Sequence, residues 1–216
     1  MRLFITFILL AGNYFAQIRE GVLTYKVELS SENNEMKDAL NMFPNSKLTI
    51  YFDSYRTRSE INIGNVIDMT TISNILSEEV TVLINSVSGK TAISSSISDY
   101  KMMIDTNSNS YHTTDSIITI KGFECKEIIT KNVFGEHKSL WLTEAIFLNS
   151  IGHNFFYLPY SGTPLKYNII YNGIYMSLSL IDFQTIDKNI LNIDQLFDTS
   201  VPKGYVLVTK DELLKN

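Results

Sequence analysis

One stretch, residues 117–143, constrains the fold of this chain more than any other part of it. It is rich in Val, Ile, Thr, Phe and Trp, and short polar segments around Gly122 and Gly135 divide it. This composition between glycine-containing turns is typical of strands joined as hairpins. The stretch also contains the only Trp and the only Cys of the chain. We therefore expect two or three adjacent antiparallel strands here, packed into a core.

Regular alternation of apolar and polar residues predicts further strands on both sides of this stretch. In residues 20–30, Leu23, Tyr25 and Val27 face one side of the predicted strand, and Lys26 and Glu28 face the other. Similar strand patterns occupy residues 47–53, 55–63, 90–98, 165–171 and 174–183 and two segments within residues 66–85, whereas residues 99–104 are ambiguous.

The order of these patterns predicts the architecture. Asn172 and Gly173 form a favoured two-residue hairpin turn between the last two strand patterns. Ile193, Leu196 and Phe197 indicate one helical turn near the end of the chain. Because strands follow strands through short turns, the sequence predicts a mainly β domain. Its expected form is a single, strongly curved antiparallel sheet, or open half-barrel, with one or two short helices packed against it.

Residues 1–16 are typical of an export signal. Met1 and Arg2 form a basic start, and residues 3–11 form an apolar run that is too short to span a bilayer. Ala16 is the expected last residue before cleavage. We therefore expect residues 17–216 to form a single β-rich domain, soluble in the periplasm, at the periphery of the outer membrane or outside the cell.

Composition excludes several classes of function. The 216 residues are 44% hydrophobic, enough for a packed core, and the formal net charge of −5 lacks the basic footprint of a nucleic-acid-binding protein. With one cysteine the chain forms no internal disulfide. Cys125 shares a strand face with Phe123, which favours a small buried hydrophobe over a reactive nucleophile.

No motif for catalysis or for metal binding is complete. Residues 89–91 look like the end of a phosphate-binding loop, but Ile84 stands where its first glycine is required. Residues 105–109 begin like a calcium loop, but Ser116 stands where the bidentate glutamate is needed. The histidines are far apart in sequence. We expect a non-enzymatic protein without metal or cofactor; a hydrolase built from scattered Ser, His and Asp is the weakest alternative.

Two apolar stripes are candidates for lining a ligand cavity. One lies on a predicted helix that Pro44 ends, and the other is one face of the second strand of the predicted hairpin. The candidate ligand-binding residues are Met36, Leu40 and Phe43 on the helix and Met176, Leu178 and Leu180 on the strand. The alternative is a helix stripe that simply covers one face or an open end of the sheet.

Arg56 and Arg58 lie two residues apart on a predicted strand, so their side chains project the same way. A pair of this kind can grip a carboxylate or a phosphate. The favoured interpretation is a solvated face on which Glu60 is their partner.

Several short stretches, in their order along the chain, resemble a family of exported proteins of Gram-negative bacteria, of the bacteroidete type. The family is similar to a group named after a Gly-Leu-Pro-Gly-Leu-Ile peptide. The matching stretches are residues 21–25, residues 48–52 with Arg56 and Arg58, residues 121–126 with 141–143, residues 162–165 and residues 201–205.

This resemblance implies a fold similar to the periplasmic lipoprotein carriers, in which a strongly bent antiparallel sheet surrounds an apolar cavity lidded by helices. The family has no established activity, so no catalytic residue is carried over. We expect an exported, non-enzymatic envelope protein that binds a lipid or other apolar ligand. The alternative is a structural or interaction protein with a filled core, for which the aromatic residues within 155–160 would form a partner patch.

Replacing Leu9 and Leu10 with Arg should keep the full-length precursor in the cytoplasm, because two charges destroy the apolar run that engages the translocation machinery. N-terminal sequencing of extracted wild-type protein should begin at Gln17. Recovery of wild-type protein with Met1 intact, or normal export of the double variant, would contradict the export signal.

Overall fold

The described strands form one large curled sheet, which confirms the expected mainly β class. In a computed structural model of the chain, the structure describes residues 17–33, 37–38, 40, 43–64, 66–104, 110–131, 137–149, 162–171, 174–187 and 192–209. None of the helices in these ranges is long and apolar enough to cross a membrane.

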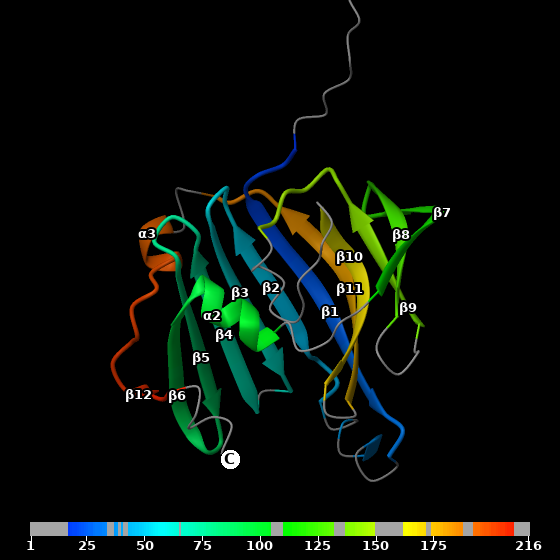
Figure 1. The fold of residues 1–216 in the computed structure, drawn as a ribbon. Helices are drawn as coiled ribbons and strands as arrows, with labels where there is room; N and C mark the ends of the chain where they lie inside the picture. The colour runs from blue at the N-terminus through cyan, green and yellow to red at the C-terminus, as the bar shows by residue number, and fades with distance from the viewer. Residues whose placement is uncertain are drawn as a thin grey trace, which may run out of the picture.

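Strands follow one another along the chain, with two short helices among the described elements (Figure 1). In chain order they are β1 (Gly21–Ser31), β2 (Lys47–Phe52), β3 (Arg56–Ile63), β4 (Ile67–Asn74), β5 (Glu79–Ser86), β6 (Gly89–Ser96), α2 (Ile97–Ile104), β7 (Ser110–Ile120), β8 (Phe123–Lys131), β9 (His137–Thr143), β10 (Thr163–Tyr171), β11 (Ile174–Gln184), α3 (Ile193–Leu196) and β12 (Val206–Leu207).

The first strand lies in the middle of the sheet. The strand order is β12-β6-β5-β4-β3-β2-β1-β11-β10-β9-β8-β7. All neighbours are antiparallel except β12, which runs parallel to β6. The chain therefore builds one half from β1 to β6, crosses through α2 to the opposite edge, and returns from β7 to the free side of β1.

The hairpin predicted around residues 172–173 is confirmed as β10 and β11, and the turn residues themselves lie outside the described residues.

One face of the sheet, called the inner face below, carries the main core. In β1, Leu23, Tyr25 and Val27 are buried, while Lys26 and Glu28 point outward and are exposed. The same alternation continues through β2 and across β11 and β10. The buried members of this main cluster are Leu23, Tyr25, Val27, Leu48, Ile50, Phe52, Ile61, Cys125, Ile128, Leu140, Leu142, Ile146, Leu148, Leu165, Tyr167, Met176, Leu178 and Leu180. Burying each large apolar side chain contributes about 1.5–3 kcal/mol, so this cluster is the main source of stability.

The half of the sheet formed by β1, β11, β10, β9, β8 and β7 curls so strongly that strands which are not neighbours come into contact. Phe123 at the start of β8 packs edge-on against Phe183 of β11, with ring centroids 5.5 Å apart, although β9 and β10 lie between the two strands. At the same end, Ile18 lies in a parallel bridge opposite Ile146: the Ile18 N–H donates to the Ala145 carbonyl at 2.8 Å, and the Phe147 N–H donates to the Ile18 carbonyl at 2.9 Å. We call this the upper end, where β1 begins; β1 runs down to the lower end (Figure 1). The curl confirms the expected half-barrel form.

The other half of the sheet is covered on both faces. On the inner face, Tyr100 of α2 packs on Val80, Val82 and Ile93. On the outer face, a second small cluster, made of Ile72, Leu83 and Ala92, lies beneath Val201 and Tyr205 of the C-terminal segment. Figure 1 shows α2 in front of this half and α3 beside it. The ambiguous residues 99–104 are thus helical, because Tyr100 gains an apolar surface to cover.

The edge strand β7 differs most from the expectation. It begins at Ser110 and not at Ile117, because its side chains are mostly exposed and no buried face imposes a regular alternation. Its pairing with β8 shifts register between Thr113 and Ile117. Glu127 holds this bulge by accepting hydrogen bonds from Thr114 Oγ1 at 3.0 Å and from Ser139 Oγ at 2.6 Å, which lower its pKa. A bulge of this kind keeps an edge strand from pairing with other chains.

Two glycines with nearly the same φ angle provide a test of the packing at the upper end, because a Cβ would meet neighbours at one of them and not at the other. Gly162 and Gly89 have φ of 126° and 128°, but a Cβ at Gly162 would meet Leu142 at 2.3 Å and the Thr143 carbonyl at 2.7 Å, whereas nothing lies within 4 Å at Gly89. Gly89→Ala should cost about 1–3 kcal/mol through strain alone. Gly162→Ala should cost about 1–3 kcal/mol more through overpacking, measured by urea unfolding. Equal losses in the two variants would contradict the packing of β9 on β10.

Candidate functional site

The interior of the curled half is filled by side chains of the protein itself. Tyr25 and Tyr167 lie edge to face with ring centroids 6.0 Å apart, and both are fully buried. The Tyr25 hydroxyl donates to the Pro164 carbonyl at 2.9 Å. At the upper end, Thr163 Oγ1 donates to the Ile146 carbonyl at 2.9 Å. These buried polar groups therefore find partners within the chain.

Cys125 lies in this interior and is chemically quiet. Its side chain is fully buried, and burial raises the pKa of the thiol to about 11. A thiol of this kind has little thiolate at neutral pH, and the thiolate is the nucleophile. The interpretation of Cys125 as a small buried hydrophobe is confirmed. Among the described residues, no group of three or more His, Cys, Asp or Glu side chains is arranged to hold a metal ion.

The structure divides the six candidate ligand-binding residues into two groups. Met176, Leu178 and Leu180 lie on the inner face of β11, 7%, 0% and 4% exposed, and belong to the main cluster. Leu40 is buried and Phe43 is half-buried, and neither is part of the main cluster in the described portion of the chain. Phe43 packs against the turn after β3, where a Cβ at Gly64 would meet its ring. Met36 lies outside the described residues.

Exposure of the inner face increases from the middle of the strands toward the lower end, and Phe183 at the upper end of β11 is half-buried as well. Along β1 the side chains change from fully buried Leu23 and Tyr25 to half-buried Leu29, and along β11 from buried Leu178 to half-buried Ile174. We call the apolar side chains at this end the lower apolar patch. Its members are Leu29, Ile63, Ile169, Ile174 and Met176. Phe43 lies at the same end, beside the turn between β3 and β4. Of the predicted ligand-binding residues this patch contains Met176, which is buried, and its half-buried members are Leu29, Ile63, Ile169 and Ile174.

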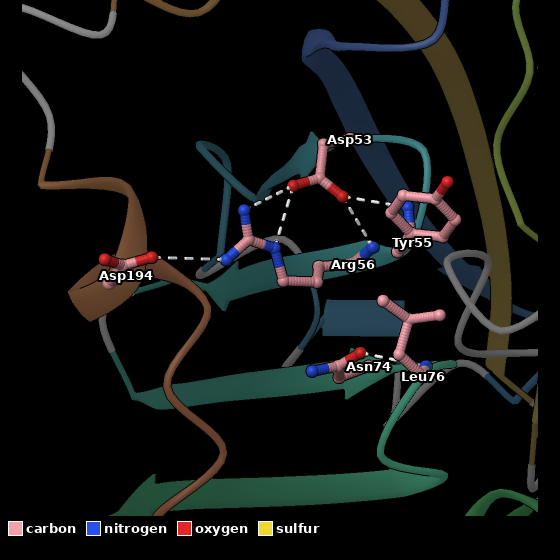
Figure 2. Close-up of polar contacts among 6 residues, drawn as sticks. All are labelled: Asp53, Tyr55, Arg56, Asn74, Leu76 and Asp194. Atoms are coloured by element: carbon pink, nitrogen blue, oxygen red, sulfur yellow. Dashed lines mark hydrogen bonds and ion pairs between the residues drawn. The ribbon is translucent and has the colours of Figure 1, made fainter.

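Arg56 is tied to groups of its own chain on the outer face. Two nitrogens of its guanidinium contact one oxygen of Asp53: Nε donates to Oδ2 at 2.8 Å, and Nη2 lies 2.7 Å from the same atom (Figure 2). Nη1 lies 3.5 Å from Asp194 of α3, and the group stacks over the ring of Phe197, 4.8 Å from its centroid. Planar guanidinium groups favour this combination of carboxylate and aromatic partners.

Arg58 is held in the same way. Its Nε donates to Glu60 at 2.5 Å, and Nη1 donates to the Leu196 carbonyl at 3.3 Å. The expectation that Glu60 is a partner is confirmed, but the face is half-buried beneath α3 and not fully solvated. With their donors engaged in this way, the two arginines position α3, and the pattern of the sequence alone does not reveal this because α3 lies more than a hundred residues away.

The strand patterns did not single out a polar strip on the inner face. Thr57 and Ser59 of β3 and Thr71 and Ser73 of β4 are all buried and lie opposite one another. Thr57 Oγ1 and Ser73 Oγ share a hydrogen bond of 2.6 Å. In the sequence, the alternation of Thr57 and Ser59 with Arg56 and Arg58 is the pattern that indicates this polar strip. These small hydroxyl side chains separate the main cluster from the cluster beneath α2.

Comparison with known proteins supports the fold of this chain and gives no information on its function. No protein-family model matches the sequence, and no curated protein matches it. A solved structure described as "Structure of PNGF-II in C2 space group" is similar to this chain, with a TM-score of 0.50 and 15% sequence identity. The similarity covers 91% of this chain and 32% of that one, so the chain spans about a third of the length of PNGF-II.

Buried tyrosines predict a loss of stability at high pH. Burial raises the pKa of Tyr100 to about 12 and raises the pKa of Tyr25 and Tyr167 well above the ordinary value of 10.0. Below pH 10 these phenols are protonated in both the folded and the unfolded protein. Above pH 10 they ionise first in the unfolded protein, so the folded protein binds more protons than the unfolded protein. The free energy of unfolding therefore falls as the pH rises. Tyr167→Phe should reduce this fall between about pH 10 and pH 12, measured by urea unfolding.

The matched control is Tyr55→Phe, which removes a hydroxyl from a side chain that is 50% exposed. Both variants are compared with the wild type over the same pH range. An identical fall in the wild type and in Tyr167→Phe would show that Tyr167 is not buried in solution.

Proposed function

We propose that this protein is an exported, non-enzymatic component of the cell envelope that binds a lipid or other apolar ligand at the lower end of its curled sheet. The observation that carries the proposal is the partial exposure of apolar side chains at the lower end of the inner face. Leu29, Ile169 and Ile174 are half-buried there, whereas the same rows are buried in the middle of the strands, at Val27, Tyr167 and Leu178. Apolar surface left accessible beside a packed core favours an apolar partner.

The ligand in this proposal rests on the lower apolar patch and does not enter the filled interior. The core around Tyr25 and Tyr167 is packed and hydrogen-bonded, so displacing it would cost several kcal/mol. Covering the patch requires no such displacement, and each Å² of apolar surface removed from water contributes about 25 cal/mol. The segment with Leu40 and Phe43 would form the border of this site.

Export is proposed from the sequence, in which a basic start, Met1 and Arg2, precedes an apolar run that is too short to span a bilayer. Gln17, the expected first residue after cleavage, donates through Nε2 to the Glu144 carbonyl at 3.1 Å, and Ile18 pairs with Ile146. We also propose, from the ordered stretches of sequence, a relationship to the exported bacteroidete-type family described above.

A second candidate is an interaction protein with no small ligand. The filled interior of the curled half favours it, because the buried hydroxyls of Tyr25 and Thr163 bond to the chain itself. The aromatic residues within 155–160, expected to form a partner patch, lie outside the described residues.

Uptake of a fluorescent fatty acid tests the first candidate. Ile174→Glu places a charge in the lower apolar patch and should weaken uptake by about tenfold or more, because an acyl chain cannot solvate a carboxylate. Ile181→Glu is the matched control on the same strand, since Ile181 is 44% exposed. Native mass spectrometry of protein from the producing cell's envelope should find a co-purified lipid. Absence of both lipid and uptake would reject apolar binding and leave the second candidate.

A further inference from the structure

Two adjacent turns at the upper end carry exposed apolar side chains. The turn between β2 and β3 carries Tyr55, which is 50% exposed, and the turn between β4 and β5 carries Ile75 and Leu76, which are 36% and 70% exposed. The Ile75 N–H donates to the Tyr55 carbonyl at 3.0 Å, so the two turns touch. Figure 2 shows the Tyr55 and Leu76 side chains on the same side of the sheet. We call Tyr55, Ile75 and Leu76 the tip patch.

Hydrogen bonds to side chains hold both turns in place. Asp53 Oδ1 accepts from the backbone N–H groups of Tyr55 at 2.9 Å and of Arg56 at 2.7 Å (Figure 2). Asn74 Oδ1 accepts from the Leu76 N–H at 3.0 Å. Arg56 in turn holds Asp53. An apolar surface on turns fixed in this way is preorganised, which lowers the entropy cost of binding a partner.

Acidic residues are frequent in the segments that adjoin the tip patch. The segments at this end are joined by contacts: the Ile97 N–H donates to the Glu78 carbonyl, Thr199 Oγ1 donates to Glu79, and Arg56 contacts Asp194. Within residues 53–56, 74–79, 97–99 and 193–198, the only basic residue is Arg56, already paired with two of the carboxylates. The acidic residues in these segments are Asp53, Glu78, Glu79, Asp99, Asp194 and Asp198.

We infer that the tip patch is a docking surface for a protein segment in which an apolar anchor is flanked by Lys or Arg residues. The apolar centre supplies the buried contact, and the acidic rim selects a basic partner and speeds its approach. The same rim repels an anionic membrane, which argues for a protein as the occupant. This inference goes beyond apolar-ligand binding and does not depend on it, since the lower apolar patch lies at the opposite end of the sheet.

Three synthetic peptides test the inference on the whole mature chain. The first has the apolar sequence Leu-Trp-Leu flanked by lysines; the second carries glutamates in place of the lysines; the third carries serines in place of Leu-Trp-Leu. In fluorescence anisotropy, the first should bind about tenfold or more tightly than either of the others, and added salt should weaken it. In NMR spectra, it should shift the amide signals of residues 53–56 and 74–79.

Substitutions on the surface locate the site. The double variant with Tyr55→Ser and Leu76→Ser should weaken the first peptide by about tenfold, because its anchor loses its contacts. Glu78→Gln should reduce the dependence on salt, since it removes a charge from the rim. Val87→Ser is the matched control, because Val87 is 88% exposed on the turn between β5 and β6 at the lower end. It should bind the peptide as the wild type does.

Equal binding of the lysine and glutamate peptides would overturn the inference. So would amide shifts confined to residues outside the two turns, or unchanged affinity in the folded double variant. Binding to phosphatidylcholine or phosphatidylglycerol vesicles that requires Leu76, with no preference for the basic peptide, would replace the protein partner with a membrane and would also overturn it. None of these results bears on fatty-acid uptake, so the two proposals fail separately.

Discussion

The rest of the structure depends on the burial of one face of β1 in the middle of the sheet. Tyr25 is fully buried there, and its hydroxyl reaches the Pro164 carbonyl, 139 residues away in sequence. This hydrogen bond fixes β10 relative to the first strand, and the edge-to-face contact with Tyr167 fills the space between them. Burying the Tyr25 hydroxyl without a hydrogen-bond partner would cost free energy. The sheet therefore has to curl far enough to bring the Pro164 carbonyl within reach of this hydroxyl.

The curl makes the two halves of the sheet physically different. From β3 across β1 to β8, side chains of the inner face pack on one another and on Ile146 and Leu148 of the segment after β9, and Phe123 reaches Phe183. Over β4, β5 and β6, α2 covers the inner face and the C-terminal segment covers the outer face. The two surfaces proposed for binding lie at the ends of the strands: the lower apolar patch at one end and the tip patch at the other.

Charged and polar side chains in this protein mainly serve its architecture. Arg56 and Arg58 connect β3 to α3, and Glu127 holds the bulge of the edge strand β7. Their partners restrict the chemistry that these groups can perform, since a guanidinium occupied by Asp53 is not available to a ligand anion. In both proposals the partner therefore meets apolar side chains at the ends of the strands.

For β1, β2 and β11 the sequence by itself determined the strand and the side that faces the core, because alternation records which side chains leave water. It also determined the hairpin of β10 and β11 and the helical turn α3. Only the tertiary structure decided that β1 is central, that β7 starts at Ser110 and that Arg56 meets Asp194. The physical reason is that alternation reports local burial, whereas strand order, an exposed edge and contacts with α3 depend on segments far apart in the chain.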